Sequence, residues 1–177
     1  MSPQEYRRLV QAGVFDEDAR IELIDGLIVD MSPKGRAHEN AIAWLARTLI
    51  TATDPAVFDV RIASPLTLGA SEPEPDIAVI AAAAPRPHHP STASLVIEVA
   101  SSSQQRDLVE KPRVYAAAGV PDYWVIDLDA RRAVTHGDVA DGVYQHVQAM
   151  SGASVLRPVA PELPSIAVAD VIAAADR

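Results

Sequence analysis

The segments Glu74-Pro75-Asp76-Ile77-Ala78-Val79-Ile80 and Ser94-Leu95-Val96-Ile97-Glu98-Val99-Ala100 have the composition of two short, buried β-strands. Both are rich in β-branched and aliphatic residues, and each carries a carboxylate that a purely structural strand would not contain. Because successive side chains of a strand alternate between its faces, Glu98 shares a face with Val96 and Ala100. An ionised carboxylate there is costly unless a cation, a metal or hydrogen-bond donors replace the lost water. Two such groups on adjacent strands would repel each other, and a divalent cation held between them is the simplest compensation.

Helical and strand patterns continue on both sides of these two segments. The predicted elements are a helix from Ser2 to Gly13, a hairpin of strands 20–25 and 27–31 around Asp25-Gly26, a helix over 36–53, strands over 57–62, 76–80 and 94–100, a helix from the serines 101–103 toward Ala118, strands over 122–128, 131–136 and 143–148, and a helix over 167–175. Residues 81–92, with His88-His89, are typical of an exposed connection. Pro112 predicts a kink at Lys111 or a later helix start. The order predicts an α/β fold with a mixed β-sheet core flanked by helices.

Length and composition limit the class of protein. A chain of 177 residues, 49% apolar and 22% charged, is expected to form a single domain over residues 1–177. The first residues lack the apolar core of a signal peptide and no apolar run has membrane-spanning length, so a cytoplasmic location without membrane contact is expected. The chain has no cysteine, which leaves oxygen or imidazole as metal ligands.

The net charge of −9 argues against broad electrostatic attraction to nucleic acid. A local basic cluster can still act within an acidic surface, and bound divalent metal would offset part of the negative charge. Only two of the 15 basic residues, Lys34 and Lys111, are lysines.

A set of motifs between Glu22 and Asp127 resembles a known family. The motifs are Glu22-Leu23-Ile24-Asp25-Gly26, Pro75-Asp76-Ile77, Val96-Ile97-Glu98-Val99, Lys111 followed by Tyr115, Gly119-Val120-Pro121, and Tyr123-Trp124-Val125-Ile126-Asp127. Together they resemble the Uma-type putative restriction endonucleases of the PD-(D/E)XK nuclease superfamily. The resemblance implies a restriction-endonuclease-like fold and a metal-dependent endonuclease that hydrolyses DNA phosphodiester bonds with Mg²⁺ or Mn²⁺.

The resemblance also implies roles for four residues. Asp76 and Glu98 would bind the metal, Glu22 would complete the acidic cluster, and Lys111 would orient or activate the attacking water. The superfamily lysine usually lies two residues after the glutamate, where this chain has Ala100. Lys111 matches a variant in which the lysine lies on the following helix.

The chemistry of these residue types fits phosphodiester hydrolysis on its own terms. The reaction needs a nucleophilic water, neutralised phosphate charge and a stabilised leaving oxygen, which carboxylates with a hard divalent ion and a nearby lysine can supply. Basic side chains available for a phosphate backbone are Lys34, Arg36, Arg106 and Arg113, and His38 could contact a phosphate. By analogy with enzymes that cut duplex DNA with two related active sites, a homodimer is expected.

Each candidate also has a structural explanation. Asp76 could cap backbone amides, Glu98 could pair with Arg61, and Glu22 could face solvent on an edge hairpin. Lys111 could form an ordinary i,i+4 ion pair with Asp107, His38 could be a satisfied or solvated histidine of the helix start, and Tyr123 and Trp124 could simply pack in the core.

Two other functions remain open from the sequence. One is a nuclease-fold binding or interaction protein without turnover, and the other is a metal-dependent hydrolase of small phosphorylated molecules.

Overall fold

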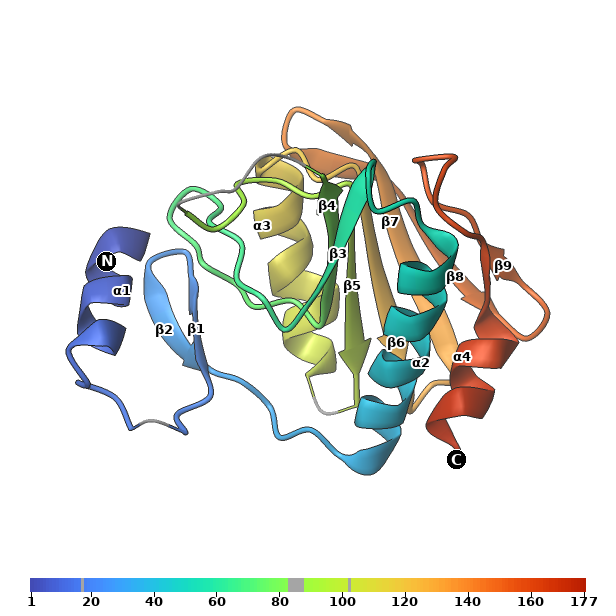
Figure 1. Cartoon of the computed structure of the whole chain (residues 1–177), viewed down its shortest axis with the longest axis horizontal. Helices are drawn as coiled ribbons and strands as arrows, with labels where there is room; N and C mark the ends of the chain where they lie inside the picture. Colours follow the sequence, from blue (N-terminus) through green and yellow to red (C-terminus); the bar gives the residue numbers. More distant parts are fainter. Residues whose placement is uncertain (17, 83–87, 102) are drawn as a thin grey trace.

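The computed structural model describes residues 1–16, 18–82, 88–101 and 103–177 (Figure 1). Its elements are, in chain order, α1 (Pro3–Gln11), β1 (Ile21–Ile24), β2 (Leu27–Asp30), α2 (Arg36–Ala52), β3 (Phe58–Ile62), β4 (Ile77–Ala81), β5 (Leu95–Ala100), the π-helical turn η1 (Arg106–Glu110), α3 (Lys111–Ala117), β6 (Asp122–Asp127), β7 (Arg132–Ala140), β8 (Val143–Ser151), β9 (Val155–Leu156), β10 (Ile166–Ala167) and α4 (Val168–Ala175). None of the helices in the described part of the chain is long and apolar enough to cross a membrane.

A six-stranded mixed sheet forms the centre of the molecule, in the order β3-β4-β5-β6-β7-β8. Strands β5 and β6 pair in parallel, and the other neighbouring pairs of this sheet are antiparallel. A parallel pair needs a crossover connection, which here runs through η1 and α3. The two central strands β5 and β6 are buried along their whole length, which explains their nearly continuous apolar sequences.

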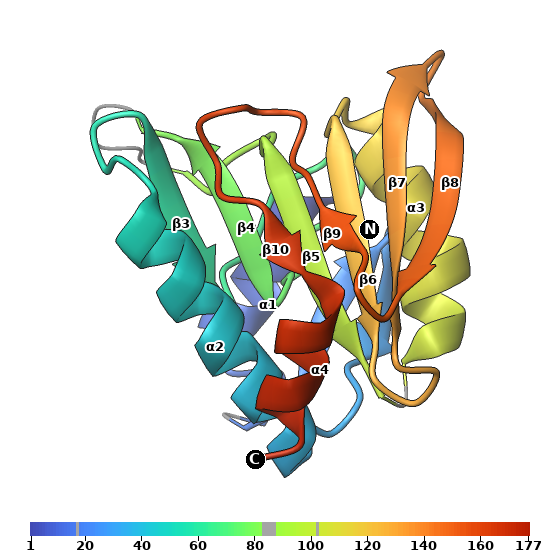
Figure 2. The same ribbon diagram turned by 90° about the vertical axis from the view of Figure 1, so that its right-hand side faces the viewer.

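Helices cover both faces of this sheet. Helices α2 and α4 lie side by side on one face, and Figure 2 shows them in front of the sheet with the short β9–β10 pair above α4. The core under them includes Leu45, Ile97 and Trp124. On the other face α3, which contributes Val114 and Tyr115, packs over Val96, Tyr123 and other apolar residues of the sheet. The predicted alternation of the β5 strand is therefore confirmed, and Glu98 projects to the α3 side.

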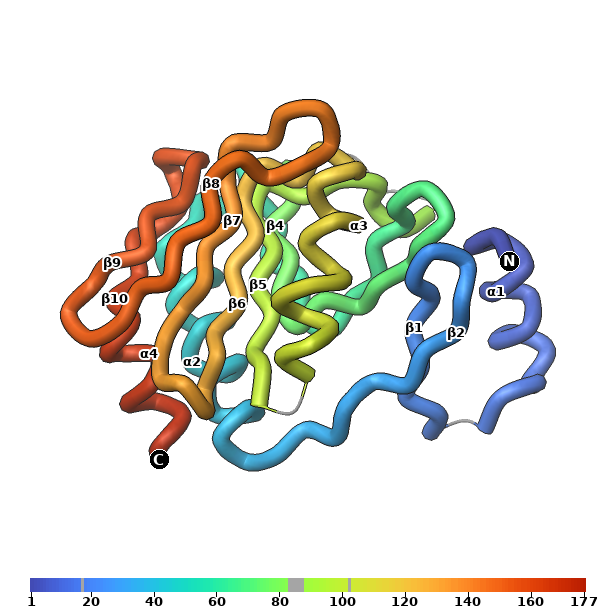
Figure 3. The backbone as a smooth tube through the Cα atoms, turned by 180° about the vertical axis from the view of Figure 1, so that it is seen from behind, coloured from blue at the N-terminus to red at the C-terminus, as the bar shows by residue number. Residues whose placement is uncertain are grey.

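The N-terminal elements lie beside α3 rather than on the main sheet. Figure 3 shows the hairpin β1–β2 between α1 and the rest of the chain. Asp25 and Gly26 form its two-residue turn, both with positive φ (48° and 78°), as the Asp-Gly sequence predicts. Backbone hydrogen bonds between Leu23 and Glu72 attach the hairpin to the loop before β4.

The predicted α/β architecture is confirmed, and two local features differ from expectation. The helix that follows the serines 101–103 is irregular, as Pro112 predicts, because the π-helical turn η1 precedes α3 and α3 begins at Lys111. Proline lacks an amide proton and its ring clashes with the carbonyl four residues earlier, which favours the wider π-turn just before Pro112. The pair β9–β10 and the length of β7 were not anticipated. Part of the predicted connection, residues 83–87, and Ser102 lie outside the described residues.

Candidate active site

Four of the predicted site residues converge on one cleft. Glu22 comes from β1, Asp76 lies just before β4, Glu98 is in the middle of β5, and Lys111 begins α3. All four are at most 5% exposed. The cleft has a volume of about 40 Å³, which is room for about three water molecules. The fold thus brings together groups separated by up to 89 positions in the sequence.

Lys111 is the central cation of the cleft. Its Nζ lies 2.8 Å from Glu98 Oε1, 3.2 Å from Glu22 Oε1 and 3.6 Å from Asp107 Oδ1. Glu98 Oε1 also accepts a hydrogen bond from the Tyr115 hydroxyl at 3.1 Å. One buried ammonium therefore faces three buried carboxylates, an arrangement that holds the lysine in a single position.

The π-turn explains how a lysine so far along the chain reaches Glu98. The Lys111 amide donates to the Arg106 carbonyl five residues earlier, so the turn is one residue wider than an α-helical turn. Asp107, within the same turn, points at Lys111 and also accepts from the Ser103 hydroxyl. The lysine thus occupies the cleft from the crossover helix, while Ala100, two residues after Glu98, is buried in the apolar core.

Asp76 is held by three donors. Its Oδ2 accepts from the Val99 amide at 2.9 Å and lies 3.1 Å from His38 Nε2, while its Oδ1 lies 3.0 Å from Lys34 Nζ. The Asp76 amide in turn donates to Glu98 Oε2 at 3.2 Å. The two proposed metal ligands are therefore direct neighbours.

Burial and neighbouring groups shift the pKa values of the cleft residues in different directions. Burial raises the pKa of Glu98 to about 8, even though the Lys111 charge opposes this shift. Burial also raises the pKa of Asp76, but hydrogen bonds from His38 and Val99 outweigh it and leave that pKa below its usual value. For Lys111, burial lowers the pKa, but the charges of Glu98 and the neighbouring acids raise it above its usual value. These charges hold Lys111 in its protonated form, which favours a role as a cation over a role as a general base.

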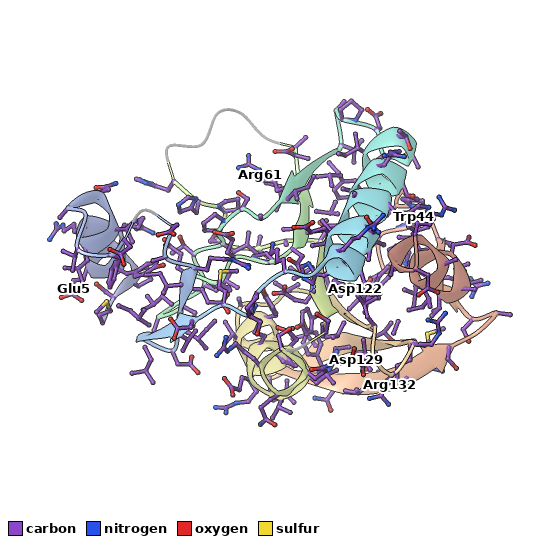
Figure 4. The ribbon with its side chains drawn as sticks, turned by 90° about the horizontal axis from the view of Figure 1, so that it is seen from below. Glu5, Trp44, Arg61, Asp122, Asp129 and Arg132 are labelled. Carbon is purple, nitrogen blue, oxygen red and sulfur yellow. The ribbon has the colours of Figure 1, made fainter. Side chains whose placement is uncertain are left out.

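Several of the structural explanations are settled by these contacts. Arg61, labelled in Figure 4, pairs with Asp59 on its own strand at 2.9 Å, so the proposed pairing with Glu98 is wrong. Glu22 is 2% exposed and does not face solvent. Lys111 does form the i,i+4 pair with Asp107, but it is closer to Glu98.

The remaining candidates fall into two groups. Lys34, His38 and Arg106 line the cleft. Arg36 lies outside its lining, exposed, with a guanidinium that donates to the Arg177 carbonyl at 3.2 Å. Arg113 lies on α3 and lines hollows next to Gly142 instead. His89 lines a different hollow beside α1. Tyr123 and Trp124 are buried and pack in the core, as their structural explanation requires.

Three residues of the cleft were not singled out for a functional role from the sequence. Arg20 lies two positions before Glu22, and side chains two apart share a face of an extended chain. Asp107 and Tyr115 lie four positions before and after Lys111, which is the spacing of neighbours on a helix. These spacings are the signal by which the three could have been found.

The donor set fits a hard divalent cation. Mg²⁺ is commonly held by one or two carboxylates together with water and substrate phosphate, and Asp76 and Glu98 supply adjacent carboxylates. No ready-made group of three acidic or imidazole ligands exists among the described residues, so water and substrate would have to supply the other ligands. Among the residues that line the cleft, the four acids Glu22, Asp76, Glu98 and Asp107 are matched in formal charge by Arg20, Lys34, Arg106 and Lys111.

Comparisons with known proteins agree with this fold. Among solved structures, a crystal structure at 1.96 Å of a putative nuclease belonging to DUF820, from Anabaena variabilis ATCC 29413, is similar with a TM-score of 0.80. It is 18% identical, and the match covers 99% of each chain, which establishes a common fold. No curated protein matches the chain significantly. The Uma2 family, described as "Putative restriction endonuclease", matches residues 3–169, and the chain therefore belongs to the Uma2 family.

Proposed function

We propose that this protein is a metal-dependent endonuclease that hydrolyses DNA phosphodiester bonds. The observation that supports this most is the convergence of Glu22, Asp76, Glu98 and Lys111 in one buried cleft. Scattered surface acids would be individually solvated and would need no cation, whereas these four groups share a single low-dielectric space.

The residues of the cleft would have distinct roles in the hydrolysis. Asp76 and Glu98 would hold Mg²⁺ or Mn²⁺, which when bound would neutralise phosphate charge and lower the pKa of a water. Val99 and His38 fix the orientation of the Asp76 carboxylate. Lys111 acts as a charge rather than a base, because its neighbours keep it protonated. Its ammonium would orient the attacking water and stabilise negative charge on the phosphate.

The mouth of the cleft carries the cations expected for phosphate binding. Arg20, Lys34 and Arg106 are each partly exposed and line the cleft. They form a local basic rim on a chain whose net charge is −9. Phosphate contacts position a nucleic acid without reading its sequence, so this rim supports a backbone-directed mode of binding. Because duplex cleavage needs two cuts, a homodimer with two related clefts is the assembly we propose.

The direct test is cleavage of supercoiled plasmid with Mg²⁺ or Mn²⁺ by the wild type and by Glu98→Gln. We expect Glu98→Gln to lose at least about 100-fold in rate, a loss typical of removing one charge-stabilising group. Asp59→Asn, an exposed carboxylate on β3, is the matched control and should cut at the wild-type rate. Equal rates for wild type and Glu98→Gln would remove Glu98 from the mechanism.

One observation favours a second candidate function. Lysines already neutralise part of the acidic cluster, so the site is compatible with a binding protein that keeps the nuclease fold without turnover. A protein that is stabilised by Mn²⁺ in a melting experiment, but cuts neither plasmid nor single-stranded DNA, would establish this alternative.

A further inference from the structure

The two lysines of the chain are held in the cleft in very different ways. Lys111 is 5% exposed in its side chain and faces three carboxylates. Lys34 is 25% exposed and pairs with one carboxylate, Asp76 Oδ1, at 3.0 Å. Removing Lys111 would leave several buried charges uncompensated, whereas the Lys34 ammonium can move into water at little cost.

Lys34 occupies an oxygen that the proposed metal would need. Asp76 Oδ2 is already engaged by His38 and by the Val99 amide, both of which hold the carboxylate from within the fold. Among the residues that the structure describes, Oδ1 pairs with the Lys34 ammonium alone. A hard cation at Oδ1 would stand in direct competition with this ammonium, because two positive groups on one oxygen repel each other.

The local chain allows Lys34 to leave. It lies in the loop of residues 31–35 between β2 and α2, with no regular secondary structure. The neighbouring Gly35 has open space beside its Cα, so no side chain packs against the loop at that point. Once released, the side chain remains at the cleft mouth with Arg20 and Arg106, where a substrate phosphate would approach.

We propose that Lys34 is an exchangeable cation that occupies Asp76 until a divalent metal replaces it, and that it is then free to contact the substrate phosphate. This inference rests on the proposed metal-dependent function. On this proposal, the position of the Lys34 side chain depends on whether the metal is bound. Metal binding would therefore release a positive charge at the cleft mouth, where the substrate phosphate approaches.

The first test measures the reactivity of the Lys34 amine in the wild-type protein. Lys34 and Lys111 are the only lysines of the chain, so acetylation by an N-hydroxysuccinimide ester can be followed at each by peptide mass spectrometry. We expect saturating Mg²⁺ to speed labelling of Lys34 several-fold and to leave the buried Lys111 protected. In Asp76→Asn, Lys34 should label quickly with or without Mg²⁺.

The second test measures Mg²⁺ affinity by calorimetry. Lys34→Gln removes the competing ammonium and should bind Mg²⁺ about five-fold more tightly, equivalent to about 1 kcal/mol. Arg36→Gln is the matched control, because it removes the same charge two residues away from Lys34. Among the described residues, the Arg36 guanidinium donates to the Arg177 carbonyl and contacts no carboxylate of the cleft. We expect its affinity to stay within about two-fold of wild type, since exposed charges are screened.

The outcomes separate this inference from the proposed function. If Mg²⁺ binds to the wild type but leaves Lys34 labelling unchanged, the exchange is disproved and the metal site survives. Tighter binding by Lys34→Gln without that labelling change would reveal simple repulsion between charges, and it also disproves the exchange. If the wild type binds no Mg²⁺ at all, both proposals fall together.

Discussion

Glu98 and Lys111 depend on each other because neither can reach bulk water. Both are buried, and their ion pair at 2.8 Å is supported by Tyr115 and by the acids on the far side of the lysine. Breaking such a pair from one side leaves an uncompensated charge in a low-dielectric space.

Removing the lysine alone should therefore be costly. We expect Lys111→Met to lower the free energy of unfolding at pH 8 by about 3 to 5 kcal/mol, as for other broken buried pairs. The double variant Lys111→Met with Glu98→Gln should recover part of that loss, since one unpaired charge is then removed. Urea denaturation checks both variants, and a Lys111→Met protein as stable as wild type would contradict the geometry of the cleft.

Asp122 offers a pH-dependent prediction away from the cleft. It accepts from Trp124 Nε1 at 2.6 Å and from the Val159 amide at 2.9 Å, and burial raises its pKa from 3.8 to about 6. Between these values the folded state binds more protons than the unfolded state, so this group makes the protein less stable as the pH rises. From pH 4 to pH 7 the loss should be about 2 kcal/mol.

The variant Asp122→Asn removes that titration. Its free energy of unfolding, measured in urea at pH 4 and pH 7, should fall less with rising pH than that of wild type. Asp129→Asn is the control, because Asp129 is exposed near Arg132 at the β6–β7 turn (Figure 4) and should keep the wild-type pH dependence. Identical pH profiles for Asp122→Asn and wild type would show that Asp122 does not titrate in this window.

Among the elements, those with a complete local signal could be predicted and those set by distant contacts could not. Asp25-Gly26 predicts its hairpin turn, and the apolar spacing from Ile42 to Leu49 predicts α2, because each signal lies within a few residues. Pro112 predicts an irregular turn, but the contact that this turn gives Lys111 with Glu98 depends on packing against β5, which no local pattern encodes. Two-residue strands such as β9 are too short to show any periodicity.

The site residues also separate into those that a local sequence pattern predicts and those that depend on distant contacts. Asp76 and Glu98 could be found because a carboxylate in an apolar strand is anomalous by itself. Asp107 and Arg20 carry no such anomaly, since one lies in a helix-like polar stretch and the other before a strand. Their roles depend on the crossover and the hairpin meeting over β5, which only the assembled fold shows.

An ion pair between Arg7 and Glu72 attaches helix α1 to the loop before β4, and its contribution to stability can be tested by mutation. Arg7 Nη1 donates to Glu72 Oε2, and Glu72 is 4% exposed. We expect Arg7→Met to lower the free energy of unfolding by about 1 to 2 kcal/mol, because the buried Glu72 carboxylate keeps only weaker partners. The exposed neighbour Arg8 provides the control, and Arg8→Met should be nearly neutral. If both variants unfold at the same urea concentration, the pair contributes nothing to attachment of α1.

For the whole molecule, an acidic chain with a small basic rim should bind DNA through few phosphate contacts. Three rim cations, Arg20, Lys34 and Arg106, predict that log K falls with log salt with a slope of about −3. Fluorescence anisotropy of a labelled duplex, titrated from 50 to 200 mM NaCl with Glu98→Gln to prevent cleavage, measures this slope. A slope twice as steep would require cations outside the cleft, with Arg36 and Arg113 as the first to examine.

The parallel pairing of β5 with β6 also bears on how the molecule matures. That pairing joins segments on either side of η1 and α3, so it closes a long loop, and contacts of this kind form late during folding. Glu98 lies on β5 of this pair and Lys111 lies in the crossover between the two strands, so the cleft is complete only when the crossover has packed onto the sheet. A nascent or partly folded chain would therefore lack the assembled cleft, and any hydrolytic competence would appear at the final step of folding rather than accumulate along the way.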